Sequence, residues 1–122
     1  MELKHVIWIG STKKDLKSFA KKVRETFGEA LMYAQCGEKH HKTKVFKHQG
    51  GSGVLEVVEE TSGGTFRMVY TVKFTEAIIV LHVFQKKSKT GIETSQQDKD
   101  LIKSRLKLAK LVYEEWLKTR EG

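Results

Sequence analysis

The apolar positions of the first forty residues predict one short strand followed by two helices. Residues 5–9 (HVIWI) are β-branched or aromatic, and glycine and serine follow them, which is typical of a strand. Thr12 then precedes two lysines and an aspartate, a pattern typical of a helix start. One apolar stripe continues from there at helical spacing: Leu16, Phe19, Ala20, Val23 and Phe27. Residues 28–40 form the second predicted helix, and Gly28 is expected to separate the two as an antiparallel pair.

The hydrophobic period changes to two after a polar, basic and glycine-rich segment at 39–53, which we interpret as a loop. The following pattern predicts a meander of three strands: 54–61, 65–74 and 77–85. The third strand is apolar on both faces, so we expect it inside the sheet. A long helix is predicted at 95–119, where Ser95 and Asp98 have the spacing of a capping box. The order β-α-α-β-β-β-α predicts an α+β fold over one domain, residues 1–122.

Composition and charge narrow the classes of partner. A chain of 122 residues fits a single domain with one modest core. The formal net charge of +8 favours an anionic partner, such as nucleic acid, an acidic protein or a membrane surface. No apolar stretch approaches the roughly 18 residues that span a bilayer, and no signal peptide is evident, so we expect no membrane partner. Cys36 is the only cysteine, which excludes an internal disulfide and fits a cytoplasmic protein. The adjacent His40 and His41 are poorly placed to share a metal ion, so no metal or other cofactor is expected.

The candidate chemistry lies on the predicted meander. Arg67 shares one face of the middle strand with Lys73, opposite the apolar face formed by its neighbours, and we expect that face to be the more open one. Glu56 on the preceding strand and His82 on the following strand lie close to it in some registers. The last strand ends in a polar, basic cluster: Lys86, Lys87, Ser88 and Lys89.

This set of groups suits phosphate binding and the cleavage of RNA by its own 2′-hydroxyl. Cleavage needs a base for the hydroxyl, cations for the charge that develops on phosphorus, and an acid for the leaving oxygen. Two structural interpretations stay open. Arg67 pairs with Glu56 across the strands, or His82 is a hydrogen-bonded core histidine.

Four stretches in this order strongly resemble the phage-derived HigB-like toxins of the RelE/ParE superfamily: GVLEVVEE, TFRMVYTV, VLHVFQKKSKTG and DKDLIKSRLKLA. The opening WIGSTKKDLKSF is also similar, so the resemblance runs over nearly the whole chain. It implies a RelE-like curved, mainly antiparallel sheet packed on helices. It also implies a type II toxin encoded beside a helix-turn-helix antitoxin. Such toxins enter the ribosomal A site and cut mRNA there without a metal ion.

The resemblance also implies roles for particular residues. Arg67 falls where RelE-type toxins keep an arginine that binds the scissile phosphate, and Lys86 and Lys87 fall where they keep a basic residue. The strand before the arginine carries acids (LEVVEE) where those toxins carry lysines. Either Glu56 or His82 would then serve as the base, or the chemistry would rely mainly on positioning and strain of the RNA. The tyrosine that RelE places after the basic cluster is missing from SKTGIET. The expected catalytic residues are therefore Glu56, Arg67, His82 and Lys87, and the expected phosphate-binding residues are Lys73, Lys86, Ser88 and Lys89.

Two other functions fit the same pattern. Acidic residues in LEVVEE favour a non-catalytic module that binds RNA or the ribosome. A ParE-like gyrase inhibitor shares the fold but has no need of the cations around Arg67. In either toxin case, an acidic segment of the antitoxin is expected to cover the first helix or the sheet face.

Overall fold

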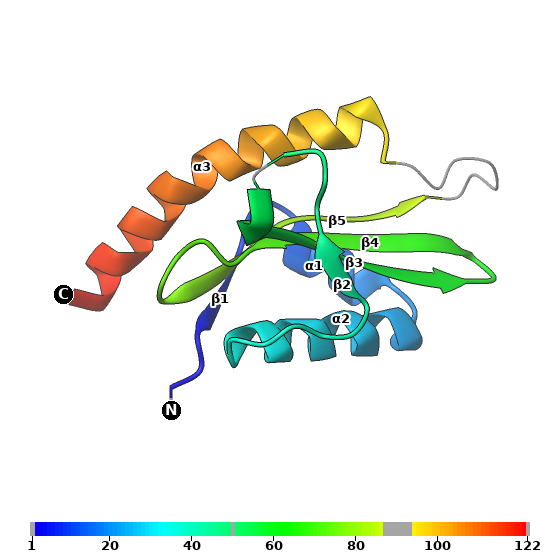
Figure 1. The fold of residues 1–122 in the computed structure, drawn as a ribbon, viewed down its shortest axis with the longest axis horizontal. Helices are drawn as coiled ribbons and strands as arrows, with labels where there is room; N and C mark the ends of the chain where they lie inside the picture. The colour runs from blue at the N-terminus through cyan, green and yellow to red at the C-terminus, as the bar shows by residue number, and fades with distance from the viewer. Residues whose placement is uncertain (1, 50, 87–93, 122) are drawn as a thin grey trace.

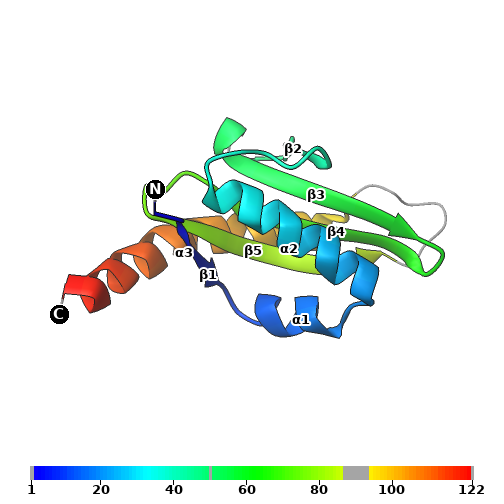
Figure 2. The ribbon, with the colours of Figure 1, turned by 90° about the horizontal axis from the view of Figure 1, so that it is seen from below.

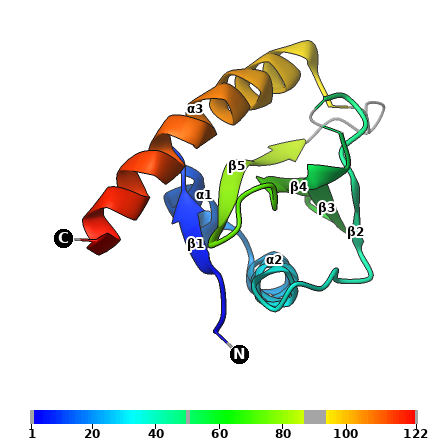
Figure 3. The same cartoon turned by 60° about the vertical axis from the view of Figure 1, so that its left-hand side comes forward.

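A five-stranded sheet separates two layers of helices in the computed structural model, which describes residues 2–49, 51–86 and 94–121 (Figure 1). The elements in chain order are β1 (His5–Trp8), α1 (Thr12–Ser18), α2 (Lys21–Gln35), β2 (Thr43–Val45), the short 3-10 helix η1 (Gly51–Gly53), β3 (Val54–Thr61), β4 (Gly64–Thr71), β5 (Ala77–Lys86) and α3 (Gln96–Glu121). Helices α1 and α2 cover one face of the sheet and α3 crosses the other (Figures 1 and 3).

The sheet is open and mostly antiparallel, with the strand order β1-β5-β4-β3-β2. Only the pair of β1 and β5 is parallel; the other three pairs are antiparallel. The predicted α+β class is therefore confirmed, and so is the predicted element order apart from the additional short strand β2. The interior position of β5 is also confirmed, because helices cover both of its faces and its apolar residues are buried on both sides.

Two apolar cores hold the layers together. On the α1/α2 side, Phe66 and Met68 of β4 pack with α2 residues such as Phe27. On the α3 side, Val69 of β4 packs with Ile102 of α3. This division follows from the alternation of side chains along a strand, which turns successive residues of β4 to opposite layers. Figure 2 shows α2 running along the near face of the sheet, with α3 behind it.

The predicted boundary between the first two helices is wrong. The break lies at Phe19 and Ala20, and Gly28 is inside α2. Phe19 has extended backbone angles (φ −79°, ψ 161°), and its ring packs edge-on against Phe66 at 4.8 Å between centroids. The apolar spacing continues across this corner because both short helices face the same sheet, so the pattern alone does not reveal the turn.

The interpretation of 39–53 as a loop is also wrong in part. Residues Thr43–Val45 form the edge strand β2, in which Lys44 pairs with Glu56 of β3. Three residues are too few for a period-two pattern to be recognised. Pairing with β3 supplies the hydrogen bonds that hold this strand in place.

Two glycines give opposite expectations for alanine substitution. Gly64, at the hairpin between β3 and β4, has φ +131°, and a Cβ there would lie 2.7 Å from the carbonyl oxygen of Lys86. We expect Gly64→Ala to lower the free energy of unfolding by about 1–3 kcal/mol. Gly28 lies in a helix with open space around it, so Gly28→Ala should raise that free energy by about 0.5–1 kcal/mol. Urea denaturation of both variants measures these changes. A change of the same sign in both variants would contradict the expectation that alanine is strained at position 64 and favourable at position 28.

Candidate functional site

A β-bulge in β5 decides which side chains share the α3 side of the sheet. Val69 of β4 is opposite His82, and Tyr70 is opposite Val80, so Leu81 is an extra residue in β5. Leu81 packs in the α3-side core and Val80 in the α1/α2-side core. Without the extra residue, His82 would point to the same side as Val80. The bulge therefore turns His82 to the side that carries Arg67.

Arg105 of α3 stabilises this bulge. Its Nη1 donates a hydrogen bond of 2.8 Å to the carbonyl oxygen of Leu81. A Cβ at Gly10 would lie 2.7 Å from Nη2 of Arg105, so a glycine there leaves room for the guanidinium. The position of His82 in β5 thus depends on the bond from Arg105 of α3, and Arg105 in turn needs the space beside Gly10.

The sequence left the register open, and the observed register places Glu56, Arg67 and His82 on one face of the sheet. Glu56 and His82 are the two cross-strand partners of Val69, and Arg67 lies two residues from Val69 on the same face of β4. Residues Glu56, Arg67, His82 and, from α3, Asp98 are called the sheet cluster below.

Arg67 and Glu56 form a buried ion pair. Nη1 of Arg67 donates to Oε2 of Glu56 at 3.0 Å, and the two residues are 8% and 6% exposed. The expectation that Arg67 lies on an open face is therefore wrong. Its cross-strand neighbours are Val58 and Phe84, whose apolar side chains lie on either side of it. Nζ of Lys44 lies 3.8 Å from the other oxygen of Glu56, so this carboxylate has a cation on each side.

His82 is held by the first turn of α3. Its Nε2 lies 2.8 Å from Oδ1 of Asp98, and its ring stacks on Phe84 with 4.4 Å between centroids. Ser95 Oγ donates to Oδ2 of Asp98 at 2.7 Å and accepts from the Asp98 backbone N–H at 3.1 Å. The predicted capping spacing of Ser95 and Asp98 is confirmed. The cap fixes the carboxylate that in turn orients the imidazole.

Burial lowers the pKa of His82 below its ordinary value, although Asp98 acts in the opposite direction. The ring is therefore neutral at pH 7, with its proton on Nε2 and directed at Asp98. Nδ1 is then a bare acceptor, and it is buried with no hydrogen-bond partner in the part of the chain that the structure describes. An imidazole that a carboxylate orients, and whose other nitrogen keeps its lone pair, has the arrangement of a general base.

This pKa shift predicts a pH dependence of stability. The unfolded chain takes up a proton on His82 near pH 6.5, whereas the folded chain does so only at lower pH. The free energy of unfolding should therefore fall as the pH drops below about 6.5, and His82→Gln should remove that part of the dependence. Urea denaturation between pH 5 and pH 8 measures this, with His41→Gln as a control at an exposed histidine. An equal slope in the wild type and His82→Gln would contradict the prediction.

The remaining predicted site residues are distributed unevenly. Lys86 ends β5 opposite Thr65. Thr65 lies two residues before Arg67 in β4, whereas Val69 lies two residues after it, so Lys86 lies beyond Arg67 as seen from Val69. Lys73 follows the other end of β4, where its side chain lies against Gly53, so the structure does not bring it to Arg67. Lys87, Ser88 and Lys89 lie outside the described residues.

A second buried charged group, which the sequence pattern did not reveal, lies on the α1/α2 side of the sheet, opposite the sheet cluster. Glu59 of β3 is 3% exposed and accepts hydrogen bonds from Thr26 and Lys42. Burial raises the pKa of Glu59, but the hydrogen bonds from Lys42 and Thr26, together with the charges of Lys42 and Lys22, outweigh it, so the pKa lies below its ordinary value. An open pocket of about 530 Å³ at this edge is lined by Lys22, Lys42, Lys44, Val58, Glu59 and Glu60. Lys44 in strand β2 and Lys42 just before it reach this edge because β2 pairs with β3, and the sequence pattern did not reveal β2.

Comparison with known proteins identifies the family. The family model described as phage-derived protein Gp49-like (DUF891) matches residues 14–107, which is most of the chain. The chain belongs to this Gp49-like family. The Gp49-like proteins are RelE-like, toxin-type proteins of toxin–antitoxin systems, so an antitoxin partner is implied. No curated protein and no solved structure gave a match.

The described residues were also compared with what a membrane-spanning helix and a metal site require. None of the described helices is long and apolar enough to cross a membrane. Within the same residues, no group of three or more His, Cys, Asp and Glu side chains is arranged to hold a metal ion.

Proposed function

We propose that this Gp49-like protein is a HigB-like toxin that cuts mRNA in the ribosomal A site, with the sheet cluster as its active site. The observation that carries the proposal is the neutral, carboxylate-oriented imidazole of His82 on the same face as Arg67. Family membership supports the coarser assignment to a toxin. Translation inhibition by such a toxin would take place in the cytoplasm.

In the proposed reaction, Nδ1 of His82 takes the proton of the 2′-hydroxyl while that oxygen attacks the adjacent phosphorus. The bond from phosphorus to the 5′-oxygen breaks, leaving a 2′,3′-cyclic phosphate and a 5′-hydroxyl. The proton for the leaving oxygen comes from a lysine, for which Lys86 and Lys87 at the end of β5 are the candidates. Asp98 holds the imidazole and stabilises it once it is protonated. Nδ1 is buried in the free chain, so in this proposal the site has to open before RNA reaches it.

Arg67 binds the scissile phosphate in this proposal and stabilises the charge that develops on it. The phosphate has to compete with Glu56 for the guanidinium, because the two are paired in the free chain. Lys44 lies on the other side of Glu56 and is available to neutralise it when Arg67 binds RNA. Glu56 is thus assigned a positioning role, and His82 the role of base. Ser88 and Lys89 are proposed to bind neighbouring phosphates.

A second candidate is a non-catalytic module that binds RNA or the ribosome. The buried pair of Arg67 and Glu56 favours it, since a purely structural ion pair needs no substrate. A gyrase inhibitor has no specific support in the described residues.

Synthesis of a reporter protein in a bacterial translation extract, together with a gyrase supercoiling assay, separates these functions. We expect the purified chain to stop reporter synthesis by shortening the mRNA, with gyrase unaffected. Loss of reporter synthesis on intact mRNA would favour the binding module, and inhibition of supercoiling would favour the gyrase inhibitor.

A further inference from the structure

The outward face of α3 carries a row of exposed leucines. Leu101, Leu108 and Leu111 are 36%, 45% and 61% exposed, whereas Ile102 and Ala109, which pack in the α3-side core, are fully buried. The exposed leucines are separated by seven and three residues, so they lie along one side of the helix. Single exposed leucines are ordinary on protein surfaces, but an aligned row is the pattern of a helix that packs against a further element.

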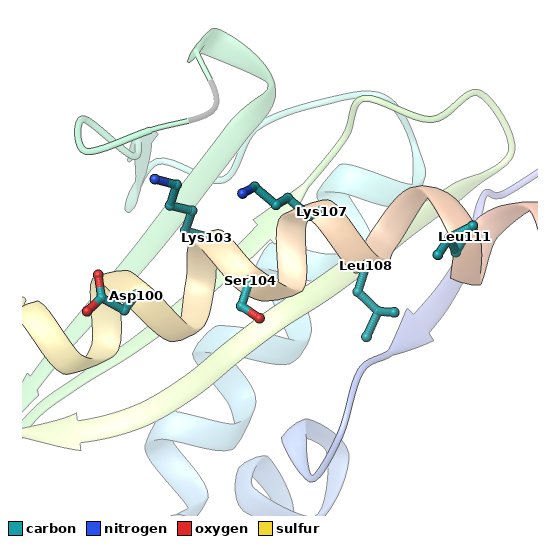
Figure 4. Close-up of a pocket in the computed structure, with 6 residues that line it drawn as sticks. All are labelled: Asp100, Lys103, Ser104, Lys107, Leu108 and Leu111. Atoms are coloured by element: carbon teal, nitrogen blue, oxygen red, sulfur yellow. The ribbon is translucent and has the colours of Figure 1, made fainter.

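A row of lysines accompanies the leucines. Lys103, Lys107 and Lys110 are exposed and lie on the neighbouring side of the same outward face. Figure 4 shows Lys103 and Lys107 projecting from one side of α3 and Leu108 from the other. A shallow pocket of about 630 Å³ runs between them, lined by Asp100, Lys103, Ser104, Lys107, Leu108 and Leu111. We call this surface the leucine–lysine face.

Its charge is one-sided. Between Asp100 and Leu111 the outward face carries three exposed lysines (Lys103, Lys107 and Lys110) and a single acid, Asp100. An occupant of this face therefore needs apolar side chains above the leucines and carboxylates beside the lysines. An amphipathic helix with an acidic flank has both, and the stretch from Asp100 to Leu111 is about 17 Å long, which matches three turns of such a helix.

We propose that the leucine–lysine face binds an acidic amphipathic helix of the antitoxin. This inference depends on the toxin–antitoxin pairing in the proposed function, but it requires no catalytic activity of the sheet cluster. It also places the contact on α3, rather than on the first helix or the sheet face where the sequence led us to expect it. Arg67 and Glu56 are already buried, and the exposed apolar row lies elsewhere.

Two other occupants fit the face less well. In a two-fold antiparallel pairing of two α3 helices, both lysine rows would lie on the same side of the interface and repel each other. An RNA strand would contact Lys103 and Lys107, but it would leave Leu108 and Leu111 without an apolar partner.

Titration of the purified, full-length chain with the protein encoded by the adjacent reading frame tests the proposal. We expect Leu108→Gln/Leu111→Gln and, separately, Lys103→Glu/Lys107→Glu to weaken binding at least about tenfold. Met32→Gln is the matched control, because Met32 is 59% exposed on α2, in the other helical layer, and its loss should leave affinity unchanged. The thermal midpoint of each variant verifies that it is folded.

Unchanged affinity in Leu108→Gln/Leu111→Gln would overturn the proposal. So would a lysine variant that loses ribosome binding but not antitoxin binding, since the face would then bind RNA. Concentration-dependent dimers that Leu108→Gln/Leu111→Gln abolishes would instead show a second copy as the occupant. A wild-type chain that binds the antitoxin through this face but leaves mRNA intact overturns the proposed function alone.

Discussion

Replacing Glu56 with glutamine should lower the free energy of unfolding by about 3–5 kcal/mol, the largest stability effect that we expect from a single substitution. The substitution leaves the charge of Arg67 buried without the carboxylate that now lies 3.0 Å away. Urea denaturation measures the loss. Lys44→Gln is the control, because Lys44 is mostly exposed and lies 3.8 Å from Glu56, so its removal should cost less than about 1 kcal/mol.

The double variant Glu56→Leu/Arg67→Met distinguishes the cost of a buried charge that has lost its carboxylate from a site that simply does not tolerate change. Removing both charges and keeping similar volume should restore most of the lost stability, because no charge is then buried at this place. A double variant less stable than Glu56→Gln would contradict this account of the pair. The double variant should also be unable to cut mRNA, since it lacks the guanidinium.

Replacing His82 with glutamine should reduce mRNA cleavage by about 10²–10⁴-fold if the imidazole acts as the base. Glutamine keeps a hydrogen-bond donor for Asp98 but has no group that takes up a proton near neutral pH. The rate of cleavage per ribosome, measured against pH in a translation extract, gives the comparison.

Asp98→Asn is the companion variant for this prediction. It keeps the shape of the helix cap but removes the carboxylate that orients His82, so it should slow cleavage less than His82→Gln and change its pH profile. Full activity of His82→Gln, in a chain of normal stability, would show that His82 only links β5 to α3.

The sequence was sufficient to predict the order of the three helices and the four longer strands, and the interior position of β5. Helix and strand periods are long and regular in those segments, and a strand with apolar residues on both sides has to be covered on both sides. The turn at Phe19 was missed because α1 and α2 bury the same apolar stripe against one sheet. The three-residue strand β2 was too short to leave a pattern, and with it the positions of Lys42 and Lys44 were missed.

The sequence was sufficient to predict which residues form the candidate site, but not the burial of Arg67 and Glu56 or the orientation of His82. The alternation of side chains along β4 correctly predicted that Arg67 points away from the α1/α2-side core. Whether His82 joins it depends on the bulge at Leu81, which is stabilised by Arg105 from a helix more than twenty residues later in the chain. Burial of the pair of Arg67 and Glu56 likewise depends on neighbours such as Phe84, whose cross-strand position is known only once the register is fixed. Asp98 was recognised as a helix cap, but its contact with His82 became evident only in three dimensions.

The most direct test of the central proposal is primer extension on a reporter mRNA in a bacterial translation extract, with and without ribosomes. The wild-type chain is compared with His82→Gln and with Arg67→Ala, and the thermal midpoint of each variant is recorded. The proposal predicts cuts at A-site codons that require ribosomes, carry 2′,3′-cyclic phosphate ends and disappear in both variants. Intact mRNA with the wild-type chain, or cuts that persist in both folded variants, would contradict the assignment of the sheet cluster as the active site.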